Sequence, residues 1–133
     1  MGGWKLYDYV DAGGANDFAG WCSGLQRPDL ARLNRKLKML ADNGPDLGPK
    51  LLAGPLKGYA HIRKIIVNGR VALRPLLCKG PIDNDHEFTL LKGAFERDRE
   101  WDPPNAREIA VERREEVIND PNRRRCYHEV VSR

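Results

Sequence analysis

Residues 61–78, HIRKIIVNGRVALRPLLC, contain two runs of aliphatic and β-branched residues on either side of an Asn68-Gly69 pair. An Asn-Gly pair between such runs is the strongest short-range signal for a β-hairpin, because both central positions of a type I′ turn require a positive φ. The pair therefore predicts a hairpin with a two-residue loop. This loop length places Val67 opposite Arg70, Ile65 opposite Ala72, and Arg63 opposite Arg74.

Successive side chains of a strand point to opposite faces, so this hairpin has an apolar face and a basic face. We expect the core face to carry Ile62, Ile66, Val71 and Leu73, and the other face to carry His61, Arg63, Arg70 and Arg74 together with Ile65 and Val67. Two arginines directly opposite each other destabilise a sheet unless something offsets their repulsion. An anion held by both Arg63 and Arg74 would do so. The alternative is that the two side chains splay into solvent or meet nearby carboxylates.

The composition indicates one domain of 133 residues with a single modest core. No segment has the roughly 20 consecutive apolar residues of a membrane span. The first residues lead into a strand-like run instead of a signal peptide. We therefore expect a cytoplasmic protein that does not contact a membrane. Cys22, Cys78 and Cys126 lie far apart without CxxC spacing, which indicates reduced thiols instead of a disulfide framework or a zinc site.

The charge distribution favours a basic patch on the hairpin. The net charge of +4 and the isoelectric point near 9.1 suit a polyanionic partner. Asp and Glu concentrate from Asp83 onward, whereas residues 57–80 contain several lysines and arginines and no acid. A nucleic acid is the kind of partner that such a patch would bind.

Ahead of the hairpin, the sequence predicts one strand and two helices. Residues 4–10 alternate enough to form a first strand. Asn16 or Asp17 can cap a short helix, and a second amphipathic helix begins near Pro28 and ends at about Asp42. The apolar positions of these helices are Phe18, Trp21 and Leu25, then Leu30, Leu33, Leu37 and Leu40. Residues 44–58 form a Gly- and Pro-rich loop that is apolar enough to pack against the sheet.

After the hairpin, the sequence predicts a last strand over residues 87–95, a charged turn over 96–100 and a helix over 106–117. Pro75 cannot donate a hydrogen bond to a neighbouring strand, so we expect a bulge or an outward-facing position there. The predicted fold is α+β, with a small antiparallel sheet of about four strands packed against two N-terminal helices and a C-terminal helix. Residues 121–133 form a basic C-terminal tail without a predicted element.

The chain lacks the motifs of the familiar catalytic sites. It contains no phosphate loop, dinucleotide-binding glycine pattern, HExxH or GxSxG, and its three histidines have no spacing that indicates metal ligation. Any catalysis would be metal-free and would use Arg, Lys, His and Tyr. RNA suits this inventory because its own 2′-hydroxyl can attack the neighbouring phosphate. The protein then has to orient the strand, move a proton and stabilise negative charge.

The order of elements and motifs resembles the RelE/ParE superfamily of bacterial type II toxins, most closely its HigB-like, phage-derived branch. The resemblance covers about residues 4–118 and indicates a RelE-like toxin domain over residues 1–120. It is carried by the segments GYAHIRKI, NGRVALR, FTLLKGAFERD and WDPPNAREIAVER. The matching positions are Ile62, Arg63, Leu73, Arg74, Leu90, Leu91, Gly93, Phe95, Arg97, Pro104, Ile109, Ala110 and Arg113.

The resemblance implies catalytic roles for three residues. Arg74 matches the strand arginine that binds the scissile phosphate, Arg97 matches the basic residue that stabilises the developing charge, and His61 lies near a lysine that acts in proton transfer. We expect further RNA contacts from Arg63, Lys64, Arg70 and Lys92. The chain differs from the family at Glu96, which replaces a basic residue, at Lys92, which replaces a histidine, and at Leu73, which replaces a tyrosine. A late catalytic tyrosine has no counterpart unless Tyr127 supplies it.

The function that these expectations describe is a toxin that cleaves mRNA, on the ribosome, without a metal or another cofactor. Its expected partners are the mRNA, the ribosome and a cognate antitoxin that covers the basic face. Glu96 and the missing tyrosine favour an alternative, a non-enzymatic ParE-like inhibitor of DNA gyrase. A third possibility is a partner-binding protein that keeps the fold without activity.

Overall fold

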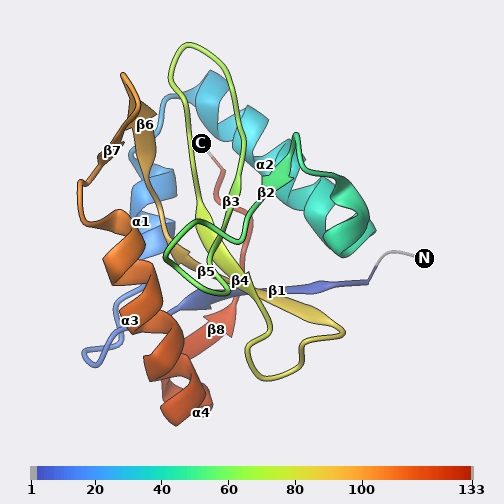
Figure 1. The fold of residues 1–133 in the computed structure, drawn as a ribbon, viewed down its shortest axis with the longest axis vertical. Helices are drawn as coiled ribbons and strands as arrows, with labels where there is room; N and C mark the ends of the chain where they lie inside the picture. The colour runs from blue at the N-terminus through green and yellow to red at the C-terminus, as the bar shows by residue number, and fades with distance from the viewer. Residues whose placement is uncertain (1–2, 133) are drawn as a thin grey trace.

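A six-stranded mixed sheet forms the centre of the computed structural model, which describes residues 3–132 (Figure 1). Its strands, in the order in which they lie side by side, are β2 (Leu52–Ala53), β3 (Arg63–Ile65), β4 (Leu76–Lys79), β5 (Glu87–Lys92), β1 (Lys5–Tyr9) and β8 (Arg125–Tyr127). β1 and β5 are parallel, and the other neighbours are antiparallel. The α+β class is confirmed, but the purely antiparallel sheet of about four strands is wrong.

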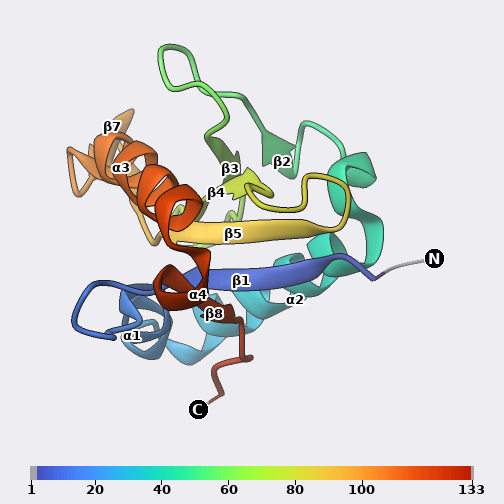
Figure 2. The same ribbon diagram turned by 90° about the horizontal axis from the view of Figure 1, so that it is seen from below.

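Helices cover both faces of this sheet (Figure 2). α1 (Asp17–Ser23) and α2 (Arg27–Asn43) lie on one face, and α3 (Ala106–Asn119) lies on the other. The Asn16 side chain caps α1 by accepting a hydrogen bond from the Ala19 backbone N–H at 3.0 Å. The predictions for β1, for these three helices and for the Asn16 cap are therefore confirmed. A 3₁₀ turn, η1 (Gly44–Leu47), and a short helix, α4 (Pro121–Arg124), complete the helical elements.

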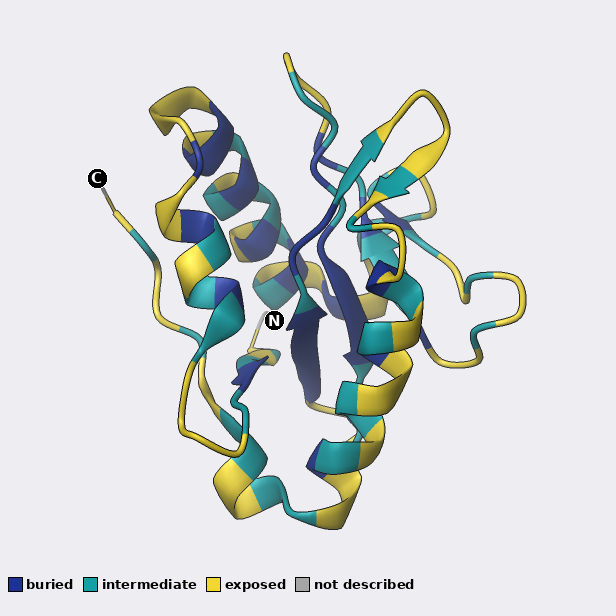
Figure 3. Ribbon diagram, turned by 90° about the vertical axis from the view of Figure 1, so that its left-hand side faces the viewer, coloured by how far each residue is buried: buried dark blue, intermediate teal, exposed yellow. Residues whose placement is uncertain are grey.

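The core has two parts, separated by the sheet (Figure 3). Phe88 and Leu90 of β5 pack with the leucines of α2, whereas Leu91 packs with Ala106, Ala110 and Val117 of α3. Alternate side chains of a strand point to opposite faces, and both faces of β5 are covered, so β5 is buried along most of its length. No helix within the described residues is both long and apolar enough to cross a bilayer.

The predicted hairpin forms, but its register differs from the prediction. Arg63 is paired with Leu77, and Val67 is paired with Leu73, so residues 68–72 form a five-residue loop. Neither Asn68 nor Gly69 has a positive φ, and a type I′ turn is therefore absent at this pair. The three-residue shift, an odd number, brings Ile65 and Val67 onto the face of Leu73, whereas Ile62 packs in the other part of the core. The shift buries Ile65, Val67 and Leu73 against α2, and this burial outweighs the local turn preference.

A two-residue turn of the predicted kind lies elsewhere, between β6 (Phe95–Arg97) and β7 (Glu100–Asp102). Asp98 and Arg99 have φ values of 50° and 69°, and Arg97 pairs with Glu100. The charged segment after residue 95 is thus a tight hairpin. It lies beside the β3–β4 hairpin, joined to it by the Leu73–Phe95 bridge.

Gly93 separates β5 from β6 in the stretch for which one strand is predicted. The indole ring of Trp21 occupies the space that a side chain at position 93 would need. Pro75 lies just before β4, where its carbonyl accepts from the Ile65 N–H at 3.0 Å. A bulge follows directly, between Leu76 and Leu77, as expected for a strand that contains a proline.

Candidate functional site

Arg74 holds the β3–β4 hairpin together. Its Nη1 donates to the Leu73 carbonyl at 2.8 Å, its Nη2 donates to Asn68 Oδ1 at 2.9 Å, and its Nε lies 3.3 Å from Glu96 Oε1. Only 12 % of the side chain is exposed. The guanidinium therefore binds groups of the protein itself. Of the arrangements expected for Arg74, the one observed is contact with a nearby carboxylate, Glu96.

Glu96 neutralises a second cation of the same face. Lys64 Nζ lies 3.0 Å from the same Glu96 Oε1, and both side chains are about three-quarters buried. Glu96 thus forms ion pairs with Arg74, a predicted catalytic residue, and with Lys64, a predicted RNA contact. An anionic ligand would have to compete with Glu96 for Lys64 and Arg74.

Aromatic rings lie next to the cations of this face. Lys64 Nζ lies 5.4 Å from the centroid of Trp101, and the Arg107 guanidinium lies 4.9 Å from the ring of Tyr59 and 5.7 Å from that of Trp101. The Tyr59 hydroxyl donates to Glu108 Oε2 at 2.6 Å, which raises the pKa of Tyr59 and lowers that of Glu108. We name Tyr59, Lys64, Trp101 and Arg107 the aromatic–cation cluster.

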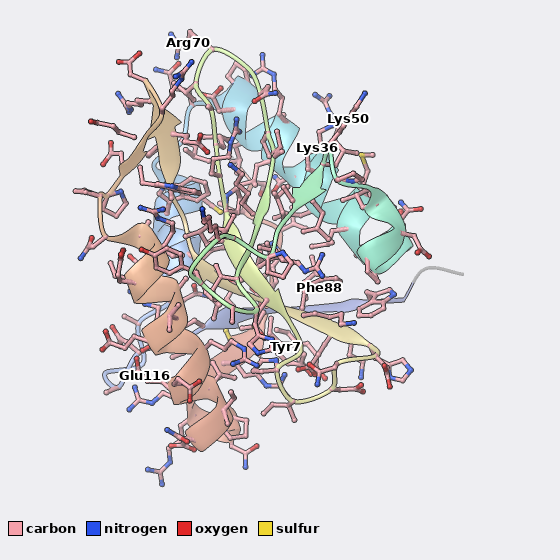
Figure 4. All side chains as sticks on the ribbon, in the orientation of Figure 1. Tyr7, Lys36, Lys50, Arg70, Phe88 and Glu116 are labelled. Atoms are coloured by element: carbon pink, nitrogen blue, oxygen red, sulfur yellow. The ribbon has the colours of Figure 1, made fainter. Side chains whose placement is uncertain are left out.

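Arg70 and Arg97 are the accessible cations beside this cluster. Both line a hollow of about 360 Å³ between the hairpin loop and β6, together with Glu96 and Asp98. Arg97 is 63 % exposed, lies 5.2 Å from the ring of Phe95, and forms an ion pair with Asp102 at 3.7 Å. Arg70 lies at the hairpin tip, where it donates to Gln26 Oε1 (Figure 4).

His61 and Arg63 line a different pocket, of about 300 Å³, with Pro55, Lys79, Asn84 and Arg114. Gly54 lies against the backbone of Arg63 and has a φ of 127°, which allows the loop that contains His61 to fold onto the start of β3. His61 itself has a φ of 70°. The structure gives no contact between His61 and either Arg74 or Arg97 among residues 3–132.

Lys92 joins β5 to two helices. Its Nζ lies 3.0 Å from Asp17 Oδ2, which also accepts from Arg113 Nη1 at 2.9 Å. Partial burial raises the pKa of Asp17, but the hydrogen bonds and charges of the two cations outweigh it, so the pKa lies below its usual value. Lys92 is therefore part of a structural ion-pair cluster.

The seven predicted site residues thus lie in three places. Arg74, Lys64, Arg70 and Arg97 surround Glu96, His61 and Arg63 share a separate pocket, and Lys92 is paired with Asp17. The sequence interpretation did not identify Tyr59, Arg107, Lys79 or Arg114 as functional candidates. The helical spacing of Arg107 and Arg114 at i and i+7 was the available signal, since it places both on one side of α3.

The remaining reactive groups do not form a site. Burial raises the pKa of Cys22 and Cys78 to about 12, and Cys126 is exposed; all three are unpaired thiols. Across the described part of the chain, His, Cys, Asp and Glu side chains form no group of three that could hold a metal ion. No protein-family model, curated protein or solved structure matches the chain.

Proposed function

We propose that this protein is a toxin of the RelE/ParE type that binds mRNA on the ribosome and cleaves it without a metal. The observation that supports the proposal is the aromatic–cation cluster beside the exposed Arg70 and Arg97. Lysines and arginines bind the phosphates of a single strand, while aromatic rings and guanidinium planes stack on its bases. The resemblance to the toxin family adds the cleavage chemistry.

In this proposal, the 2′-hydroxyl of the RNA attacks the adjacent phosphate and the protein supplies charge and orientation. Arg97 is the cation best placed to reach a bound strand, because its side chain is largely exposed and its ion pair with Asp102 is longer and more exposed than those of Lys64 and Arg74. Arg74 keeps the hairpin in shape and positions Glu96. A cognate antitoxin would hold the protein inactive by covering this basic face with acidic side chains.

The test is mapping of mRNA 5′ ends after brief induction in cells that lack a cognate antitoxin. The wild type should produce new ends within translated codons, and Arg97→Gln should reduce them by about 10²-fold, the effect of removing one positioned charge. Lys50→Gln is the matched control, because it removes the same charge from an exposed loop distant from the cluster. Unchanged cleavage by the Arg97→Gln protein would reject the proposed role of Arg97.

The ion pairs of Glu96 with Arg74 and Lys64 favour a second candidate function, non-enzymatic inhibition of DNA gyrase. A phosphate-binding arginine that is already neutralised is poorly prepared for cleavage. Growth arrest with DNA breakage, an SOS response and intact mRNA would support this candidate. Growth arrest with new mRNA ends and intact DNA would exclude it.

A further inference from the structure

The pocket that contains His61 and Arg63 gathers basic side chains from four parts of the chain. His61 comes from the loop before β3, Arg63 from the start of β3, Lys79 from the end of β4, and Arg114 from α3. Its other lining residues are Pro55 and Asn84, so no carboxylate lines it. This composition distinguishes it from the region around Arg74, where Glu96 is in direct contact with the cations.

Three of the four basic side chains that line this pocket have no polar partner in the described part of the chain. Within the described residues, the side chains of His61, Arg63 and Lys79 form no hydrogen bond or ion pair. Arg114 contacts the Cys78 thiol and lies 3.6 Å from Glu115 Oε1, but its buried Nε has no hydrogen-bond partner. Unlike His61, Arg63 and Lys79, the other predicted site residues Lys64, Arg74 and Lys92 each pair with a carboxylate.

Like charges that converge in a partly enclosed hollow repel one another, and a bound anion removes this repulsion. Two arginines and a lysine suit a phosphate group, because a guanidinium can donate two parallel hydrogen bonds to phosphate oxygens and an ammonium adds a point charge. A volume of about 300 Å³ accommodates a phosphate with part of its attached sugar. Asn84 adds an uncharged hydrogen-bonding group at the rim.

We propose that Arg63, Lys79 and Arg114 form a phosphate-binding site and that its ligand is a phosphate of a single-stranded RNA. The phosphate site itself follows from the pocket alone, whereas the RNA as its source rests on the proposed function. Phosphate would thus bind at this site and not at Arg74, whose guanidinium forms an ion pair with Glu96. His61 would then lie next to the bound phosphate, in position to contact the neighbouring ribose.

The experiment compares binding of two probes by the purified chain. Phosphorus NMR measures binding of inorganic phosphate, and fluorescence anisotropy at several salt concentrations measures binding of a single-stranded oligoribonucleotide. Lys79→Gln and Arg63→Gln should each lower the affinity for both probes by at least about tenfold. Each should also lower the salt slope of RNA binding by about one. Lys50→Gln should leave both affinities unchanged, and circular dichroism and thermal midpoints should verify that all variants are folded.

Different results would reject the phosphate site, the RNA ligand or the proposed nuclease activity. Wild-type affinities in both pocket variants, or no phosphate binding by the wild type, would overturn the site. Loss of phosphate binding with unchanged RNA affinity would retain the pocket and reject RNA as the source of the phosphate. Pocket-dependent phosphate binding in a protein that generates no mRNA ends in cells would reject the proposed nuclease but not the site.

Discussion

Glu96 decides which cations of the basic face are free to bind a ligand. One of its oxygens serves both Lys64 and Arg74, at 3.0 and 3.3 Å. The hairpin arginine that matches the family motif is thereby held inside the protein. Arg63 and Lys79, which have no such carboxylate, lie at the start of β3 and at the end of β4, where both line a separate pocket.

Replacement of Glu96 by Gln should therefore raise RNA affinity several-fold, because the net charge becomes more positive and two cations lose their carboxylate. The same change should lower the free energy of unfolding by about 1 kcal/mol, since the amide retains an acceptor but no charge. Anisotropy with a single-stranded oligoribonucleotide and urea unfolding measure the two effects. An unchanged affinity would mean that the bound RNA does not pass near Lys64 and Arg74.

At the residue level, the sequence indicates which positions are basic but not which of them are neutralised. The pairing of Arg74 with Glu96 depends on the hairpin register and on where β6 lies, and both are set by contacts between distant segments. The like-charge pair expected from Asn68-Gly69 disappears for the same reason, because Arg63 pairs with Leu77 in the observed register.

Elements with their own local signals are the ones that the sequence predicts well. Asn16 caps α1, and the leucine spacing of α2 identifies its buried side. Elements that depend on a distant partner are missed: β2 is only two residues long and exists because it pairs with β3. The parallel pairing of β1 with β5 has no short-range signal, since more than 70 residues separate the two strands.

The Asp17 cluster links three elements and should make stability depend on pH. Asp17 of α1 binds Lys92 of β5 and Arg113 of α3, and Arg113 also donates to the Leu91 carbonyl at 2.9 Å. Because the pKa of Asp17 is lower in the folded protein, its contribution is complete above the unfolded value of about 3.9. The contribution is lost as the pH falls through the folded pKa.

Asp17→Asn should therefore reduce the free energy of unfolding at pH 7, and the difference from the wild type should shrink as the pH falls below about 4. Urea unfolding across this pH range measures the difference. Asp46→Asn is a suitable control, because Asp46 is exposed and forms no ion pair within residues 3–132. A difference between wild type and Asp17→Asn that stays constant at every pH would contradict the role given to this carboxylate.

At the scale of the whole molecule, the C-terminal residues complete the sheet instead of extending from it. β8 lies beside β1, and Arg125 reaches past β1 to Glu87 of β5, with Nη1 2.5 Å from Oε2. Tyr127 stacks on Tyr7 with ring centroids 4.8 Å apart. Asn34 of α2 donates to the Val131 carbonyl at 2.9 Å, so the last residues also contact the helical layer. Residues 121–132 therefore belong to the same structural unit as the rest of the described chain.

The most deeply buried of these anchors is the pair of His128 with Asp8. Their side chains are 6 % and 1 % exposed, His128 Nδ1 lies 2.8 Å from Asp8 Oδ1, and Asn16 donates to Oδ2 at 2.9 Å. Removal of the imidazole would leave the buried Asp8 carboxylate with Asn16 alone. His128→Ala should therefore lower the free energy of unfolding by about 2–4 kcal/mol and release β8 from the sheet edge.

Urea unfolding and amide hydrogen exchange in β1 test this prediction. The matched control is His86→Ala, because His86 also pairs with an aspartate, Asp83, but its side chain is 71 % exposed. Burial determines the cost of breaking such a pair, so the control should change stability by less than about 0.5 kcal/mol. Faster exchange in β1 only in the His128→Ala protein would show that the C-terminal strand protects this edge of the sheet. Equal stability losses in the two variants would instead mean that the buried pair contributes no more than a surface one.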